Sequence, residues 1–372
     1  MKEHNQISER RRNMIKTVIA GLGVASVVSA PLIKPSLKLA KKSKQKIIIR
    51  TSGGRDHIAY TKILFEPFTK ETGIEIEAVI SNVEPIAEIR TMVNTRTYRW
   101  NMACLSNRAV PILGKEGYLE KHLLEHDPVV SAIVPRFLSE YSVGMNVYST
   151  VLAYREEAFK GRPAPRTWKD FWDVKNFPGR RALRKIPFDT IEEALLADNV
   201  PPGEVYSCND LDRAFRSLDK IKPHISVWWQ NAPQAEHLLK TGEVDLLPAF
   251  SLGALAAIEV GAPVAFSWDQ HIYGYDNWTI LKGTPNADAC RQFIQFATDP
   301  ERQARLIPYG VAPTQSSALA QEVLQRNRID PKYVRLLATY PANLEKGMPS
   351  DGLYWADKHS STIERFNQWM LN

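Results

Sequence analysis

The chain has 372 residues, of which 44% are hydrophobic and 24% are charged, and its formal net charge is +7. Residues 1–46 hold 11 of its 48 lysines and arginines and 2 of its 41 acidic residues, which leaves 37 basic and 39 acidic residues in the rest. A nearly neutral body argues against a protein that binds nucleic acid through clustered Lys and Arg. The remaining length is enough for two domains of about 100–200 residues each.

Residues 1–45 have the pattern of a twin-arginine export signal followed by a basic linker. Arg11 and Arg12 precede a weakly apolar run over 17–31 that is rich in small residues. This run is too short for a bilayer about 30 Å thick, so an export signal is favoured over a membrane anchor. The alternative is a basic cytosolic tail. We expect a periplasmic protein carried by the twin-arginine translocase. Pro31 hinders cleavage after the small residues before it, so both cleavage and retention of the leader stay open.

The segments after residue 45 alternate between strand and helix patterns, which predicts an α/β fold. A β-branched run at 46–50, a helical pattern at 58–69 and an alternating run at 74–79 predict a βαβ unit. Its first turn contains Ser52, Gly53 and Gly54. Parallel sheets bind ligands at the carboxyl ends of their strands, so we expect these three residues to contact a solute through backbone N–H groups. The G-x-G-x-x-G spacing of a nucleotide-binding turn is absent.

Further along the chain, residues 143–154 have the pattern of an extended crossing segment. Thr167 with Asp170 predicts a capped helix start, and Asp189 predicts the N-cap of another helix. Residues 242–250 and 276–283 have strand patterns, and 287–298 a helical pattern.

The three cysteines (Cys104, Cys208 and Cys290) lie far apart and form no C-x-x-C pair, so neither a metal site nor a redox site is predicted. We expect buried structural thiols, with at most one disulfide. The scattered histidines match no zinc-ligand spacing. We therefore predict neither a metal nor a cofactor.

The order of these segments resembles the extracellular solute-binding proteins of ABC importers, in the branch that contains the spermidine/putrescine-binding proteins. The resemblance covers nearly the whole chain after the leader. It rests on several runs: FEPFTKETGI at 65–74, TWKDFWD at 167–173, FPGR at 177–180, the helix at 189–197, LLKTGEVD at 238–245, KGTPNA at 282–287 and TDPERQA at 298–304.

This resemblance implies the type II periplasmic binding protein fold, which has two α/β lobes and a ligand cleft between them. The larger lobe would comprise 46–145 plus 273–315 and the smaller lobe 150–270, with C-terminal helices at 316–372 packing across both. We expect separate sheets in the lobes, not one continuous sheet from residue 47 to 280. Such a protein captures its solute by lobe closure without catalysis and delivers it to a permease in the inner membrane. We expect a monomer.

The resemblance also predicts ligand-binding residues for an amine. A protonated amine needs carboxylates at its head and aromatic faces along its body. Asp276 matches the acid that grips an ammonium group in the polyamine binders, whereas Gly274 stands where those proteins carry a tryptophan. Asp189 and Glu192 match a second acidic pair, or they are only a cap and a first-turn acid. A polyamine is the favoured solute, and an amino-acid conjugate or another nitrogen-containing solute is the alternative.

The other candidates are aromatic or polar. Trp228 and Trp229 match an aromatic wall of the cleft, or they are buried in the smaller lobe. Gln315 matches a polar residue that faces the ligand, or it is an ordinary loop residue. Asn107 is a candidate contact from the larger lobe, or a turn residue.

Two other functions stay open. A secreted enzyme is disfavoured because the chain lacks G-x-S-x-G, H-E-x-x-H and a cysteine cluster. Two acids three residues apart on one helix, such as Asp189 and Glu192, would not flank a glycosidic bond. A periplasmic ligand-sensing protein of the same fold is not distinguished from a transport protein by sequence.

Overall fold

The structure is a computed structural model that describes residues 45–81, 83–208 and 210–371. These described residues form one compact unit. The predicted export signal lies outside the described residues apart from residue 45. Within the described part of the chain, no helix is long and apolar enough to cross a membrane.

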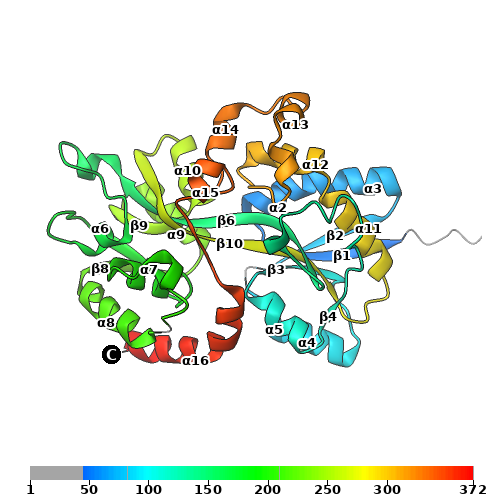
Figure 1. The fold of residues 1–372 in the computed structure, drawn as a ribbon, viewed down its shortest axis with the longest axis horizontal. Coiled ribbons are helices and arrows are strands. Elements are labelled where there is room, and N and C mark those ends of the chain that lie inside the picture. Colours follow the sequence, from blue (N-terminus) through cyan, green and yellow to red (C-terminus); the bar gives the residue numbers. More distant parts are fainter. Residues whose placement is uncertain (1–44, 82, 209, 372) are drawn as a thin grey trace, which may run out of the picture. The chain divides into compact units, whose positions relative to one another are not determined.

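Strands and helices alternate from residue 46 to about residue 300, and helices dominate the rest of the described chain (Figure 1). The strands are β1 (Lys46–Thr51), β2 (Glu75–Ile80), β3 (Met102–Ser106), β4 (Leu119–Glu120), β5 (Leu138–Ser139), β6 (Ser142–Arg155), β7 (Arg181–Arg184), β8 (Ile225–Trp229), β9 (Leu246–Phe250), β10 (Val264–Leu281) and β11 (Met348–Pro349). The helices are α2 (Gly54–Tyr60), α3 (Glu66–Thr72), α4 (Ile86–Thr95), α5 (Ala109–Lys115), α6 (Trp168–Trp172), α7 (Thr190–Ala197), α8 (Leu211–Ile221), α9 (Ala232–Thr241), α10 (Ser251–Glu259), α11 (Ala287–Ala297), α12 (Pro300–Leu306), α13 (Gln321–Arg326), α14 (Pro331–Arg335), α15 (Pro341–Leu344) and α16 (Gly352–Leu371).

The main sheet has the strand order β2-β1-β3-β10-β6-β9-β7-β8. Strands β1 and β2 are parallel, with Ile47 opposite Ile76, which confirms the predicted βαβ unit. Its connection is longer than predicted, because α2 begins at Gly54 and continues through a π-helical turn into α3. The antiparallel pair of β6, with 14 residues, and β10, with 18 residues, runs through the middle of the sheet (Figure 1).

Hydrogen bonding is continuous across this sheet, so the prediction of separate sheets is wrong. The reason is the length of β6 and β10. The end of β10 pairs with β3, whereas the later part of β6 pairs with β9. These two long strands therefore belong to both halves of the sheet. We call the half with β1, β2 and β3 the first half, and the half with β7, β8 and β9 the second half.

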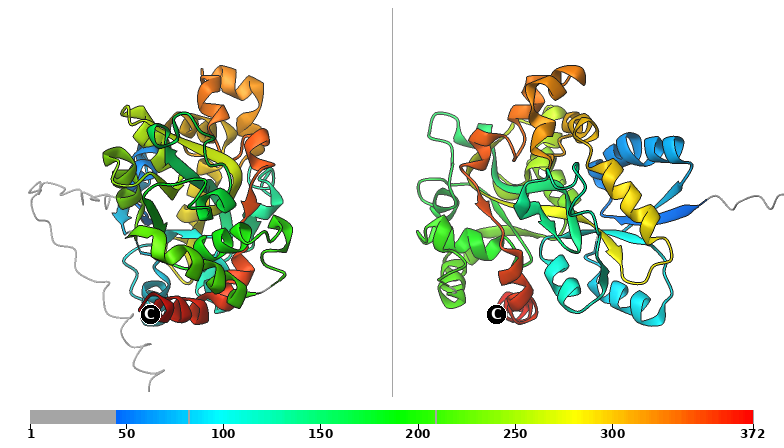
Figure 2. Two further views of the ribbon diagram at one scale, coloured as in Figure 1. Left: turned by 90° about the vertical axis from the view of Figure 1, so that its left-hand side faces the viewer. Right: turned by 45° about the vertical axis from the view of Figure 1, so that its right-hand side comes forward.

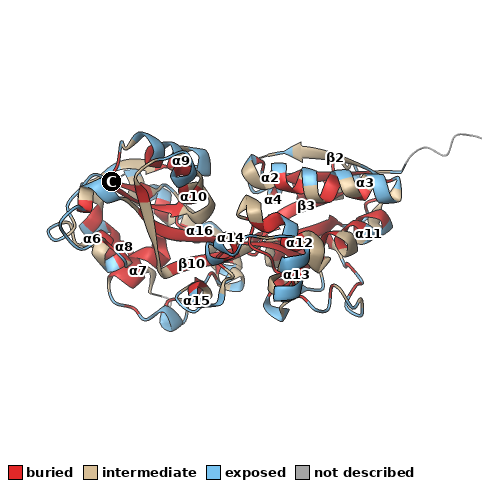
Figure 3. Ribbon diagram, turned by 90° about the horizontal axis from the view of Figure 1, so that it is seen from above, coloured by how far each residue is buried: buried red, intermediate tan, exposed pale blue. Residues whose placement is uncertain are grey.

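Helices cover both faces of each half, and each face has its own apolar cluster. In the first half, Phe68 of α3 and Phe293 of α11 pack on one face, and Leu113 of α5 packs on the other. In the second half, the neighbouring residues Leu246 and Leu247 of β9 point to opposite clusters, as side chains alternate along a strand. Figure 3 shows that the buried residues concentrate in the strands and the inner helix faces.

The segment after residue 316 contacts both halves. Figure 2 shows it in orange and red, ending in α16. Helix α16 contacts α5 of the first half, and its Trp355 and Phe366 lie in the apolar cluster of α7 and α8 in the second half. Strand β11 pairs with β10 between them. The lobe boundaries given above stay a prediction.

Two local predictions have clear outcomes. Thr167 and Asp170 form the predicted capping box at the start of α6. Asp189 occupies the N-cap position of α7, but the prediction that its side chain caps the helix is wrong, because that side chain makes no capping hydrogen bond. Its φ of 66° lies in the left-handed region, which is strained for a residue with a Cβ.

All three cysteines are free in the structure. Cys104 and Cys290 are buried as predicted, whereas Cys208 is exposed, so the prediction of a buried thiol is wrong there. Cys208 lies in the segment between the short 3₁₀ turn at Pro202–Glu204 and α8, where the chain runs at the surface.

Candidate functional site

Charged and polar side chains gather where the two halves of the sheet meet. We call this group the central cluster. Its members come from the segments after β2 and β3, from the end of β7, from the middle of β6 and β10, and from the start of α7. They are Glu84, Arg108, Tyr148, Arg184, Asp189, Glu192 and Asp276. Arg108 follows β3 in the first half, and its guanidinium lies 4.9 Å from the ring centre of Phe188, which precedes α7 in the second half.

Arg108 is a partly buried cation without a protein anion among the described residues. Its Nη1 is buried and has no hydrogen-bond partner among the described residues, and no carboxylate of those residues lies within 4 Å of the guanidinium. Burial lowers the pKa of Arg108, but Tyr148, Asp189, Glu84 and Glu192 act in the opposite direction and the net pKa is raised. The guanidinium therefore stays charged. A guanidinium fork of this kind matches a carboxylate in charge and shape.

Arg184, at the end of β7, differs because the protein already pairs it. Its Nη1 lies 3.2 Å from Oδ2 of Asp189, and its guanidinium lies 5.2 Å from the ring centre of Trp229 and 5.0 Å from that of Phe250. The same Asp189 oxygen accepts a hydrogen bond of 2.9 Å from Thr150. Asp189 thus has two partners within the protein, so its negative charge is compensated without a ligand.

Asp276, in β10, is an acid without such partners. Its carboxylate accepts no hydrogen bond from the described residues. Burial, together with the negative charges of Glu84 and Asp56, raises the pKa of Asp276 to about 7, although Arg108 acts in the opposite direction. A β-bulge between Asp276 and Asn277 interrupts the pairing with β6. A bulge re-aims side chains, which is consistent with an acid directed out of the sheet.

Glu192 is a second acid, and one of its two carboxylate oxygens has no hydrogen-bond partner among the described residues. Its Oε1 accepts hydrogen bonds from Nε1 of Trp355 at 2.6 Å and from the hydroxyl of Tyr206 at 2.8 Å. Its Oε2 is buried without a partner among the described residues. Burial and the nearby negative charge of Asp189 together raise the pKa of Glu192 to about 7. The neighbouring Glu193 is fully buried, and burial raises its pKa well above the usual range.

The residues predicted from sequence are only partly together. Asp189, Glu192 and Asp276 belong to the central cluster, and Trp229 borders it through its contact with Arg184. Trp228 faces the other side of β8, where it packs against Trp369 of α16 at 5.8 Å between ring centres. This separation of Trp228 from Trp229 follows from the alternation of side chains along a strand. The structure therefore places Trp228 outside the cluster.

The remaining predicted residues lie at or beyond the edge of the cluster. Asn107 precedes Arg108, but its amide donates 2.9 Å to the carbonyl of Ser350. Gln315 lies elsewhere, fully buried, and donates 2.9 Å to the carbonyl of Val129. The turn of Ser52, Gly53 and Gly54 joins β1 to α2, and Asp56 in that helix acts on Asp276. That any of these residues binds a solute stays a prediction.

Sequence reasoning missed Arg108, Tyr148 and Arg184. Arg108 directly follows Asn107 just after the end of β3, so the strand-end argument used for the turn at 52–54 applies to it as well. Arg184 is the last residue of its strand and carries the same signal. Tyr148 lies within a long strand, and no local pattern distinguishes it from the other strand residues.

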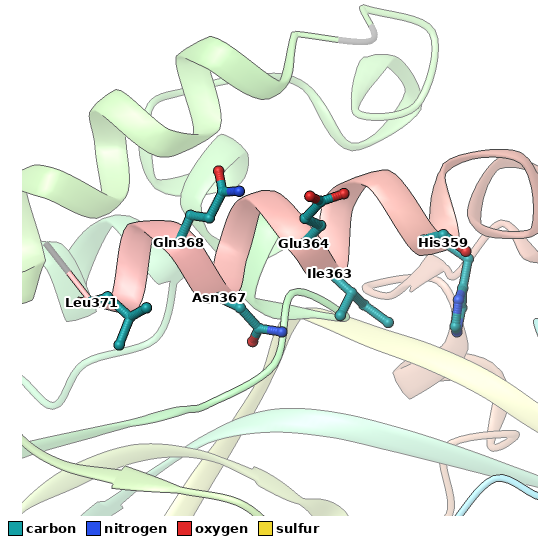
Figure 4. A pocket seen from close by; sticks show the side chains of 7 residues that line it. His359, Ile363, Glu364, Asn367, Gln368 and Leu371 are labelled. Atoms are coloured by element: carbon teal, nitrogen blue, oxygen red, sulfur yellow. The ribbon is translucent and has the colours of Figure 1, made fainter.

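Two surface hollows among the described residues lie away from the central cluster. One of about 480 Å³ is lined by residues of α16 alone, including His359, Ile363 and Asn367 (Figure 4). Another of about 510 Å³ lies between β2 and the helical segment at 57–70. Neither brings acids and unpaired cations together. No group of three or more metal-ligating side chains occurs among the described residues. We therefore base the site on the unpaired charges of the central cluster.

Comparisons with known proteins agree on one family. Residues 64–330 match the model of a family described as bacterial extracellular solute-binding proteins. The chain is 32% identical to the gamma-aminobutyric acid-binding protein of Pseudomonas aeruginosa, over 89% of this chain and 92% of that protein. A crystal structure of an ABC transporter substrate-binding protein from Bradyrhizobium japonicum is 34% identical, with a TM-score of 0.82 over 88% of this chain and 99% of that one. A structure described as a GABA receptor is 29% identical, with a TM-score of 0.77 over 87% and 97%.

Proposed function

The chain belongs to the family of bacterial extracellular solute-binding proteins, and from this premise we propose that it binds a small amino-carboxylate of the size and charge of 4-aminobutanoate. Its mixed α/β fold is that of the two-lobed periplasmic binding proteins of ABC transporters, as predicted. It is the solute-binding component of such a transporter, and it works with a membrane permease. The identity of the solute and the residues that bind it are our proposal.

The observation that carries the proposal is the coexistence of an unpaired cation and unpaired acids in one cluster. The Arg108 guanidinium lacks an anion, and Asp276 lacks a cation, among the described residues. Both residues are partly buried, and a charge that is withdrawn from water is stabilised by a counter-charge and hydrogen bonds. A solute with a carboxylate at one end and an ammonium at the other would pair both groups at once. The relatives named for gamma-aminobutyric acid support this choice.

A polyamine remains the alternative, because Asp276 and Glu192 both have acidic oxygens without a partner among the described residues. It fits less well than an amino-carboxylate, since a second ammonium group would face Arg108 and leave that cation without an anion. Membership of the spermidine/putrescine branch stays a prediction for the same reason.

The proposal is tested by removing each unpaired charge in turn. Arg108→Met and Asp276→Asn should each weaken binding of 4-aminobutanoate by about 2–5 kcal/mol, because each leaves one end of the solute buried without a counter-charge. Thermal shift and calorimetry with 4-aminobutanoate, butanoate and n-butylamine measure this. Arg90→Met is the matched control, since Arg90 pairs with Glu116 at the surface. Unchanged affinity in both variants would refute the assignment.

The remaining functional features are proposed on the sequence and the family. We propose export by the twin-arginine translocase, a monomeric state and the absence of catalysis. Fractionation of cells that lack that translocase, with Arg11→Lys plus Arg12→Lys as a second arm, tests the route. Light scattering tests the oligomeric state, and recovery of unchanged solute after long incubation tests for turnover. Turnover of the solute would favour the enzyme alternative, and loss of solute uptake on deletion of the gene would favour transport over sensing.

A further inference from the structure

We propose that Tyr148, held over Gly274, contacts the carboxylate end of the solute beside Arg108 and thereby sets the preference for amino-carboxylates over diamines. This inference rests on the proposed function and names the residue pair that determines its specificity.

Tyr148 and Gly274 face each other directly across two antiparallel strands. Tyr148 of β6 is paired in register with Gly274 of β10. A Cβ atom added at position 274 would lie 2.4 Å from the Tyr148 hydroxyl oxygen, 2.5 Å from Cζ and 2.9 Å from Cε2. The phenol ring therefore occupies the space of the missing side chain. An aromatic ring that covers a cross-strand glycine in this way is a recognised stabilising arrangement in sheets.

A second residue also packs against the ring. Phe250, the last residue of β9, packs edge-to-face against Tyr148 with 5.9 Å between ring centres. Because Gly274 and Phe250 hold the ring from two directions, its hydroxyl has a defined position. That position is inside the central cluster, where the charged groups that act on Tyr148 are Arg108, Asp276, Asp189 and Glu84.

The hydroxyl of Tyr148 has no hydrogen-bond partner among the described residues, although it is buried. Burial raises the pKa of Tyr148 despite the nearby Arg108 guanidinium, so the hydroxyl keeps its proton and is a donor. Buried polar groups in proteins are almost always hydrogen-bonded, so this donor needs an acceptor.

The neighbouring groups decide which acceptor fits. Arg108 supplies only donors, and the Tyr148 hydroxyl adds another. A carboxylate accepts from both, as an anion between a guanidinium and a phenol. An ammonium group supplies donors only and would be repelled by the guanidinium. A side chain at position 274 would displace the ring and remove the hydroxyl from this place. Gly274 is thus a positioning residue for Tyr148.

The hydroxyl is tested by Tyr148→Phe, which keeps the ring over Gly274. We expect binding of 4-aminobutanoate to weaken about tenfold to a hundredfold, the range for a hydrogen bond to a charged group. The preference for 4-aminobutanoate over 1,4-diaminobutane should fall by a similar factor, because the diamine has no carboxylate. Titration calorimetry measures both. A loss smaller than about tenfold for 4-aminobutanoate overturns the proposal.

The role of Gly274 is tested by a double-mutant cycle of Gly274→Ala and Tyr148→Ala, with unfolding free energy as the readout. Gly274→Ala should destabilise the protein when Tyr148 is present and should cost much less in the Tyr148→Ala background, because the clash is then gone. Equal costs in both backgrounds overturn the positioning role. The matched controls are Gly114→Ala and Tyr141→Phe. A Cβ at Gly114 would lie 2.9 Å from the Tyr141 ring, outside the central cluster. Both controls should bind 4-aminobutanoate like the unmodified chain.

The unmodified chain separates failure of this inference from failure of the proposed function. If it binds 4-aminobutanoate and Tyr148→Phe binds equally well, the inference is wrong and the proposed function stands. If it binds 1,4-diaminobutane but no amino-carboxylate, both are wrong.

Discussion

The buried side chain of His271 should make a contribution to the free energy of unfolding that is lost as the pH falls, and replacement of His271 by glutamine should remove this contribution. His271 is fully buried in β10, and its ring is closed in, because a Cβ at Gly347 would lie 2.3 Å from its Nε2. Nε2 lies 2.9 Å from the carbonyl oxygen of Asn343, which is an acceptor only, so Nε2 carries the proton. Nδ1 then accepts a hydrogen bond of 2.5 Å from the Ser149 hydroxyl. The ring is therefore neutral, with both nitrogens used.

Burial lowers the pKa of His271 from 6.5 to about 4, opposed only by the hydrogen bond to Asn343. In the unfolded chain the imidazole takes up a proton as the pH falls through about 6.5, whereas in the folded protein it stays neutral until about pH 4. The stability contribution of the neutral ring is therefore complete above pH 6.5 and is lost progressively below it. One pKa unit corresponds to about 1.4 kcal/mol, so the loss between pH 7 and pH 4.5 is about 2 kcal/mol.

Denaturant unfolding of the unmodified chain and of His271→Gln, at pH 7 and at pH 4.5, measures this contribution. The difference between the two proteins is the quantity to compare, because acids with raised pKa values, such as Glu192 and Asp276, change stability in the opposite direction in both. We expect that difference to shrink by about 2 kcal/mol at the lower pH. The exposed His224→Gln is the control. A difference that does not depend on pH would refute the reasoning.

Three further predictions concern the solute, the core and the surface. Affinity for 4-aminobutanoate should fall below pH 7 by up to about tenfold per pH unit, because Asp276, with a pKa of about 7, must lose its proton to pair with an ammonium group. Calorimetry at pH 5.5 and pH 8 measures this change, and an affinity that does not depend on pH would contradict the prediction. Phe366→Ala should cost about 3–5 kcal/mol of unfolding free energy, because this fully buried ring of α16 fills the cluster of α7 and α8; a cost under about 1 kcal/mol would show that α16 is not anchored there. Glu259→Gln breaks the half-exposed ion pair with Arg55 (2.7 Å) and should cost less than about 1 kcal/mol, with the effect fading at high salt; a larger, salt-independent cost would contradict this.

Sequence predicted the elements whose determinants are local. The βαβ unit over 46–80 followed from the change of apolar spacing from strand to helix and back. The cap at Thr167 followed from a side chain three residues from its partner. In both cases the residues that determine the structure lie close together in the sequence, so the local sequence pattern is enough to predict it.

Features that depend on distant contacts were not predictable in the same way. Asp189 has an N-cap sequence, but Thr150 and Arg184 compete for its carboxylate from other strands. The continuity of the sheet depends on how far β6 and β10 remain paired, which only their full register reveals.

The candidate site also contains residues that sequence could predict and residues that only the fold reveals. Asp276 was found because the resemblance to a known family supplied its role, and the structure places it among unpaired charges. Arg108 is the basis of our proposal of an amino-carboxylate in place of a diamine. Its guanidinium supports that proposal because no protein anion pairs with it among the described residues. Whether a charged side chain has a partner of opposite charge depends on the folded structure, and no sequence pattern reveals it.

The most direct measurement is titration calorimetry of the unmodified chain with 4-aminobutanoate and with 1,4-diaminobutane under identical conditions near pH 7.5. The two solutes share a four-carbon chain and one ammonium group, and they differ only in the group at the other end. Pairing of that group with Arg108 predicts tighter binding of 4-aminobutanoate. Tighter binding of 1,4-diaminobutane would contradict the assignment and restore the polyamine alternative.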